Sequence, residues 1–63
     1  MEHKREILLR LPQLEKVVGM KRTTIYKRMA AGTFPRPVRL GANSVAWKSG
    51  TVQEWIDSLQ VTP

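Results

Sequence analysis

Gly19 divides the first half of this 63-residue sequence into two short helical patterns. Pro12 suits the first position of a helix, where its missing N–H is not needed. Three apolar residues then follow at i, i+3 and i+4 as one stripe: Leu14, Val17 and Val18. A glycine can end such a helix in a left-handed conformation without a side-chain clash. We therefore expect one helix before Gly19, a tight turn, and a second helix that begins near Lys21 or Arg22.

The second segment, Lys21 to Gly32, reads KRTTIYKRMAAG and has two opposed faces. Ile25 and Met29 stack one turn apart on the face that packs. The opposite face has small side chains and hydrogen-bond donors, which suit a DNA major groove about 12 Å wide. It carries Thr23, Lys27 and Ala30, with Tyr26 on its flank. Two short helices joined by a glycine turn are typical of a helix-turn-helix, although a basic helix whose outer face is only solvated is the alternative.

A β-hairpin is predicted after the second helix. Phe34, Pro35 and Pro37 enforce an extended path. Two alternating runs then flank the turn residues 41–43. The side chains expected to point inward are Val38, Leu40, Val45 and Trp47. Arg39 is expected to point outward, so the hairpin fits the wing of a winged helix as well as a plain structural hairpin with solvated cations.

The flanking segments complete the predicted core. Ile7 to Leu11 is a brief strand or an extended lead-in ahead of Pro12. A third helix is expected to be capped by Ser49 or Gly50, with Gln53 reaching back to the cap. Its apolar stripe consists of Val52, Trp55, Ile56 and Leu59. Trp47 and Trp55 each lie on the apolar side of their predicted strand or helix, so we interpret them as core residues rather than as base-stacking residues.

Charge favours a polyanionic partner. The chain has 11 Lys and Arg against five Asp and Glu, and no acid lies between Lys16 and Lys48. This asymmetry favours nucleic acid over an anionic membrane, because no segment has the large apolar face of an interfacial helix. With no cysteine, a single histidine at His3 and scattered carboxylates, we expect no enzyme activity, no metal and no cofactor. No apolar run is long enough for a signal peptide or a membrane span.

The sequence resembles the AlpA family of small phage and prophage regulators. The resemblance covers about Leu8 to Leu59 and is carried by the Thr24-Ile25-Tyr26 run with Lys27, the segment from Gly32 to Pro37, the Leu40-Gly41 turn and the Trp47…Trp55 pair. The family shares a winged helix-turn-helix fold with excisionases and MerR-type domains. Members commonly have a helix-capping serine where this chain has Lys21, and often another where it has Gly50.

The resemblance and the residue patterns together predict a mainly α-helical, winged helix-turn-helix unit over residues 7–59, with tails at 1–6 and 60–63. We expect a cytoplasmic, nucleoid-associated regulator of transcription in a prophage or mobile element, acting on an integrase gene. An excisionase-type factor that bends attachment-site DNA is the alternative in the same fold. Double-stranded DNA is the expected partner, and a second copy on DNA or an integrase is a further candidate. No small-molecule substrate is expected.

Ten residues are predicted to contact DNA. Those assigned to base edges are Arg22, Thr23, Tyr26 and Lys27. Those assigned to the backbone are Lys21, Thr24, Arg28, Arg36, Arg39 and Lys48. Arg28 lies closer to the packed side of its helix than Lys27 does.

Two other classes of function compete with this interpretation. A protein-interaction module whose basic face meets an acidic partner would show no binding to duplex DNA at physiological salt. RNA binding is less favoured, because single-strand readers need exposed aromatic residues and only Tyr26 is a good candidate.

Overall fold

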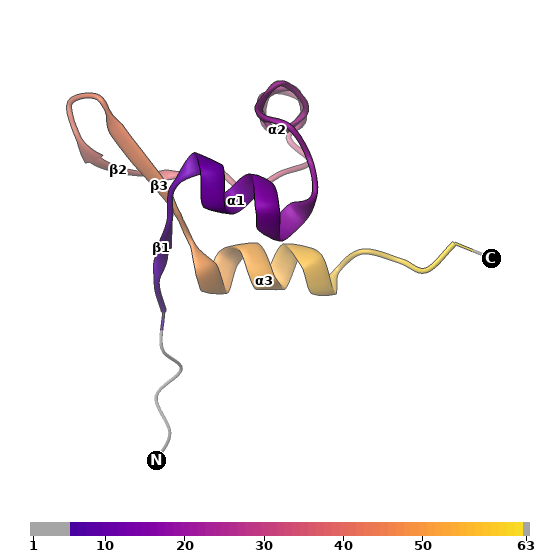
Figure 1. Cartoon of the computed structure of the whole chain (residues 1–63). Coiled ribbons are helices and arrows are strands. Elements are labelled where there is room, and N and C mark those ends of the chain that lie inside the picture. Colours follow the sequence, from indigo (N-terminus) through magenta and orange to yellow (C-terminus); the bar gives the residue numbers. More distant parts are fainter. Residues whose placement is uncertain (1–5, 63) are drawn as a thin grey trace, which may run out of the picture.

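The computed structural model describes residues 6–62 and has three helices and a small antiparallel sheet (Figure 1). The elements follow in the order β1 (Leu8–Leu9), α1 (Leu11–Val18), α2 (Arg22–Ala30), β2 (Val38–Gly41), β3 (Ser44–Lys48) and α3 (Ser49–Asp57). The strand order in the sheet is β1-β3-β2. This arrangement agrees with the predicted winged helix-turn-helix class. Residues 1–5, which include His3, lie outside the described residues.

The turn between α1 and α2 forms as predicted. Gly19 has φ 72°, and its N–H donates to the Glu15 carbonyl at 2.8 Å. α1 begins one residue before Pro12, with Arg10 as its N-cap, and the Gln13 side-chain oxygen accepts the Arg10 N–H at 2.9 Å. A glycine in the left-handed region ends α1 without steric strain, so the chain can reverse into α2.

The apolar stripe of α1 is rotated from its predicted position. Leu14 is fully buried, and Leu11 and Val18 pack against the core. Val17 is 50% exposed, so the prediction that it belongs to the stripe was wrong. Successive helical residues are about 100° apart, and the inclusion of Leu11 shifts the centre of the stripe away from Val17.

α2 ends in a Schellman motif at Gly32, which has φ 79°. The Gly32 N–H donates to the Met29 carbonyl at 3.0 Å, and the Thr33 N–H donates to the Arg28 carbonyl at 2.9 Å. The prediction that Gly32 ends this helix is confirmed. The chain leaves the motif toward the core, where Phe34 is buried.

The predicted hairpin forms, but its pairing is irregular. Gly41 pairs with Ser44, but an irregularity between Arg39 and Gly41 then shifts the pairing, so that Val38 lies opposite Ala46 rather than Trp47. Because side chains alternate along a strand, a shift of one residue moves Val38 to the other face of the sheet from Trp47. Leu40, which lies at the irregularity, is 47% exposed, so its predicted inward direction was wrong.

The two tryptophans anchor the segment that follows α2. The Trp47 indole N–H donates to the Pro35 carbonyl at 3.0 Å, and the Trp55 indole N–H donates to the Thr33 carbonyl at 2.8 Å. Phe34 lies between these bonds and meets Trp55 edge-on at 4.7 Å between ring centroids. Trp47 is buried and Trp55 packs against the core, as predicted.

α3 is capped differently from the prediction. Its N-cap is Lys48, which makes no side-chain cap bond, and Gln53 bonds forward to Asp57 rather than back to the cap. The segment before β1 supplies the missing contacts. Glu6 accepts the Gly50 N–H at 3.3 Å, and the backbones of Ile7 and Ser49 are bonded.

The apolar stripe of α3 is shorter than predicted. Val52 is buried, and Trp55 and Ile56 pack against the core. Leu59 lies beyond the end of the helix and is 54% exposed, so its assignment to the stripe was wrong.

Candidate nucleic-acid interface

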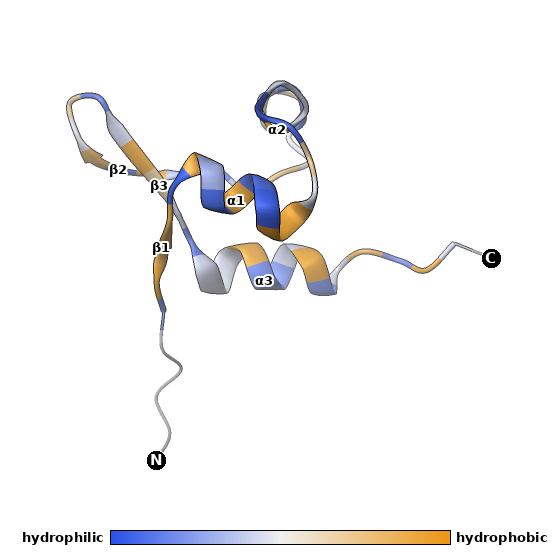
Figure 2. Ribbon diagram, in the orientation of Figure 1, coloured by the Kyte–Doolittle hydropathy of each residue, from blue (hydrophilic) through white to orange (hydrophobic). Residues whose placement is uncertain are grey.

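α2 presents a polar face to solvent while its opposite face is held in the core. Ile25 is fully buried and Met29 packs against the core. Thr23 and Lys27 are exposed, as the prediction of a recognition helix requires. Tyr26 is 42% exposed on the flank of this face. Figure 2 shows that α2 is largely hydrophilic, whereas β1 is mostly apolar.

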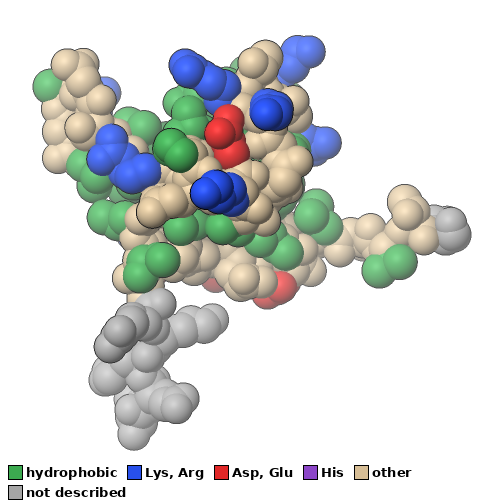
Figure 3. Space-filling model, in the orientation of Figure 1, with side chains coloured by type: hydrophobic (Ala, Val, Ile, Leu, Met, Phe, Trp, Pro, Cys, Tyr) green, Lys and Arg blue, Asp and Glu red, His purple; other side chains and the backbone are tan. Residues whose placement is uncertain are grey.

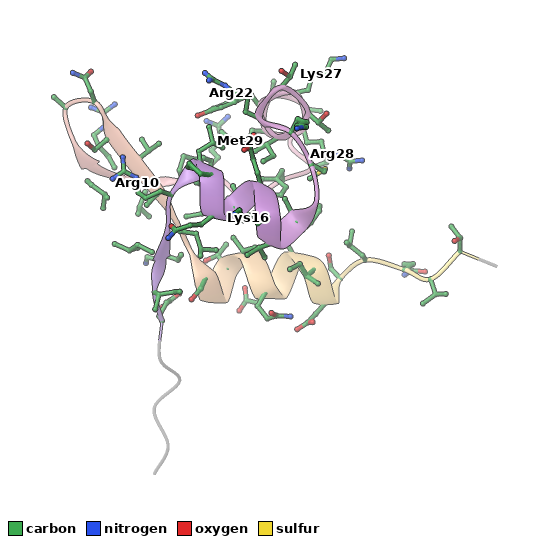
Figure 4. The ribbon with its side chains drawn as sticks, viewed as in Figure 1. Arg10, Lys16, Arg22, Lys27, Arg28 and Met29 are labelled. Carbon is green, nitrogen blue, oxygen red and sulfur yellow. The ribbon has the colours of Figure 1, made fainter. Side chains whose placement is uncertain are left out.

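Cations surround this face. Arg22 and Lys27 project from α2 on the side away from α1 (Figure 4). Lys21, Thr24 and Arg28 are also exposed, so Arg28 is not covered by the packed side of the helix. All of the predicted contact residues of α2 and its N-cap are therefore accessible to a ligand.

The hairpin lies on the same side of the molecule as α2, whereas α3 lies on the other (Figure 1). Arg36 and Arg39 are exposed before and within β2. Lys48 is exposed as well, but it is paired with Leu8 of β1, whereas Arg39 is paired with Val45. Alternation along β3 places Lys48 and Arg39 on opposite faces of the sheet. Lys48 is thus the predicted contact that the structure separates from Arg39.

Two further cations were missed by sequence reasoning. Arg10 and Lys16 are exposed just before and in the middle of α1. In Figure 4, Lys16 lies on the face of α1 that is turned to the viewer, and Arg10 lies beside the start of α1 on the side of the hairpin. Figure 3 shows that the Lys and Arg side chains gather over α2 and continue across this face. Lys16 could have been identified from the sequence, because it is a cation on the polar side of the first predicted helix. Arg10 precedes the first predicted helix, and only the fold brings it to this surface.

One carboxylate lies within the basic surface. Glu15 is on α1, and its Oε2 accepts the Arg22 N–H at 2.7 Å. It also lines an open groove together with Pro12, Lys16, Gly19, Met20 and Lys21. The acids of α3, Glu54 and Asp57, belong to the helix on the other side of the molecule. Sequence reasoning did not give Glu15 a role, because its partner is a backbone group seven residues away.

Between residues 6 and 62, no group of three or more His, Cys, Asp or Glu side chains is arranged to hold a metal ion. In the same part of the chain, no helix is long and apolar enough to cross a membrane. Every buried side-chain N or O atom there has a hydrogen-bond partner.

These features define a small winged helix-turn-helix protein with an exposed basic surface. The family model described as "Prophage CP4-57 regulatory protein (AlpA)" matches residues 7–60. The chain therefore belongs to the AlpA family of prophage regulatory proteins, as the sequence resemblance indicated.

Two relatives are similar over most of this chain. The uncharacterized protein ORF88 of Enterobacteria phage P4 is 39% identical over 51 residues, which are 81% of this chain and 58% of the phage protein. The DNA-binding transcriptional activator AlpA of Escherichia coli K12 is 36% identical in an alignment of 55 residues that covers 78% of this chain and 79% of that protein. No solved structure matches the chain significantly.

Proposed function

We propose that this chain is a sequence-specific, double-stranded DNA-binding protein that regulates transcription in a prophage or mobile element. The observation that carries this proposal is the division of α2 into a buried face at Ile25 and an exposed, donor-bearing face at Thr23 and Lys27. The E. coli relative is named as a DNA-binding transcriptional activator, which supports the same function. An integrase gene is the proposed target, and the proposed location is the bacterial nucleoid.

In the proposed complex, α2 lies in the major groove. A helix of this kind reads bases with its exposed side chains while α1 supports it from behind. Base edges are assigned to Arg22, Thr23, Tyr26 and Lys27. The guanidinium and ammonium groups suit guanine O6 and N7, and the threonine hydroxyl can pair with several bases.

Backbone phosphates are assigned to residues around the helix and on the hairpin. They are Lys21, Thr24, Arg28, Arg36, Arg39 and Lys48, to which we add Arg10 and Lys16. Cations placed on phosphates release counterions from DNA, so they raise affinity for every sequence and make that affinity fall with salt. The salt dependence of binding and its dependence on DNA sequence therefore distinguish the backbone contacts from the base contacts.

Selection of bound duplexes from a random pool tests the proposal. The selection is run at about 50 mM and about 200 mM salt, because backbone-dominated binding weakens strongly over this range. We expect a defined sequence to be enriched at both concentrations. Failure to bind any duplex at physiological salt would refute the proposal and favour a module that meets an acidic protein.

The same experiment distinguishes the two roles within the fold. A footprint over a promoter supports the regulator, whereas tandem direct repeats beside a recombination core, with strong bending, support an excisionase-type factor. A single module of this type buries about 600–1,000 Å² on DNA, so we propose that several copies act together or with an integrase. The spacing of the enriched sites would show how those copies are arranged.

A further inference from the structure

We propose that Glu15 is a specificity-determining residue of the DNA-binding surface, because its carboxylate caps the recognition helix from α1 and keeps phosphate off the backbone N–H at the start of that helix. This inference rests on the proposed function. Its first part concerns the fold and can be tested without DNA, and its second part concerns the ligand.

The need for a cap arises at Lys21. This residue is the N-cap of α2 in extended geometry, with φ −78° and ψ 161°, but its side chain makes no cap bond. An ammonium group is a donor only, so it cannot accept from the backbone N–H groups of the first turn. A helix start leaves such donors without partners inside the helix. The backbone N–H groups in the first turn of α2 therefore need an acceptor other than the Lys21 side chain.

Glu15 supplies that acceptor from the preceding helix. Its Oε2 lies 2.7 Å from the backbone nitrogen of Arg22, the first residue of α2. A negative group at this end of a helix is also favoured by the helix dipole. The bond joins the middle of α1 to the start of α2 across the Gly19 turn, so it restricts the angle between the two helices.

The surroundings give the carboxylate a second effect. Lys16 and Lys21 lie beside Glu15 in the same groove, and the cations of α2 begin at Arg22. Protein–DNA complexes commonly place phosphate oxygens at helix N-termini. The Glu15 carboxylate is hydrogen-bonded to the Arg22 N–H, so it occupies the place that a phosphate oxygen would take. Its negative charge also repels phosphate. Arg22 and Thr23, the first two residues of α2, are then left to approach bases rather than the backbone.

Two substitutions separate the hydrogen bond from the charge. Glu15→Gln keeps an acceptor oxygen and removes the charge, whereas Glu15→Ala removes both. Glu54→Gln is the matched control, because Glu54 is an exposed acid on α3. A second control is Lys21→Ser in the Glu15→Ala background, which places a side-chain acceptor at the N-cap itself.

Amide hydrogen exchange tests the cap. We expect the Arg22 N–H to be protected in the unmodified protein and in Glu15→Gln, and to exchange faster in Glu15→Ala. Adding Lys21→Ser to Glu15→Ala is expected to protect the N–H of Thr23 or Thr24 and to leave that of Arg22 fast, because an N-cap side chain accepts from the second or third residue of the helix. Equal protection in Glu15→Ala and the unmodified protein would overturn the assignment of the cap. This result is independent of any DNA measurement.

Binding to a random duplex tests the effect of the charge. At low salt, Glu15→Gln is expected to bind roughly threefold more tightly than the unmodified protein, from the repulsion of two charges about 7 Å apart in water. The gain should shrink at high salt and exceed any gain of Glu54→Gln. An equal or weaker affinity of Glu15→Gln would overturn the specificity role. If neither the unmodified protein nor its variants bound duplex, the proposed function itself would fail, and the specificity role with it.

Discussion

Trp47→Phe tests how the segment after α2 is anchored. The Trp47 side chain is 1% exposed, and its indole N–H donates to the Pro35 carbonyl at 3.0 Å. Phenylalanine keeps an aromatic ring in the core but has no donor. Leaving this carbonyl without its partner costs about 1–3 kcal/mol. The smaller ring loses buried area equal to roughly two methylene groups, at about 0.8 kcal/mol each. We therefore expect destabilisation of about 2.5–4.5 kcal/mol.

Urea unfolding followed by far-ultraviolet circular dichroism measures this change without relying on tryptophan fluorescence. A chain of this length is expected to have a total stability of about 3–9 kcal/mol, so the loss is a large share of it. Trp55→Phe is the matched control. Its indole N–H donates to the Thr33 carbonyl at 2.8 Å on the exposed side of the core, where water can replace the bond, so we expect a smaller loss of about 0.5–1.5 kcal/mol.

Equal unfolding midpoints for Trp47→Phe and Trp55→Phe would refute this reasoning. Such a result would mean that breaking the partly buried bond to Pro35 costs no more than breaking the exposed bond to Thr33. Midpoints unchanged in both variants would remove the argument that the two indoles fix the chain between α2 and the hairpin, and with it the physical reason for a fixed spacing between the recognition helix and the wing.

Three further predictions concern the surface and the turns. Lys27→Ala is expected to cost about 1–3 kcal/mol of affinity for the selected duplex and to relax sequence choice, whereas Arg39→Ala should weaken all duplexes alike and reduce the salt slope by about one unit. Equal losses for Lys27→Ala on selected and random duplex would contradict its assignment to a base. Gly32→Ala is expected to cost about 1–2 kcal/mol of stability in urea unfolding, because φ is 79° while the space around an added Cβ is open; an unchanged midpoint would show that α2 ends in another way. Leu40→Ser should change stability by no more than about 0.5 kcal/mol, since this side chain is 47% exposed, and a larger loss would mean that it is buried.

The sequence predicted the elements whose causes are local. Gly19 and Gly32 mark the ends of α1 and α2 because only these positions adopt positive φ in the described chain. Ile25 and Met29 identify the packed face of α2 from their spacing alone. The exposed face of α2 was predicted for the same reason, because it is the side that faces solvent when the apolar side of this nine-residue helix packs in the core.

The hairpin could be predicted only in outline. Its alternating runs and turn residues indicate two strands, but the irregularity between Arg39 and Gly41 decides which face each side chain takes. A one-residue shift reverses that choice for the rest of a strand. The positions of Val38 and Leu40 therefore depend on pairing with β3, and the pattern of β2 alone does not contain that information.

What the sequence by itself determined is where this chain bends and which side of α2 is apolar, because these follow from the backbone freedom of glycine and from helical periodicity. Only the tertiary structure decided that Glu15 reaches the start of α2, that Arg10 and Lys16 extend the basic surface, and that Lys48 points away from Arg39. Each of these depends on how two elements meet in space. Such contacts are set by packing and strand register across the whole chain, which no local pattern specifies.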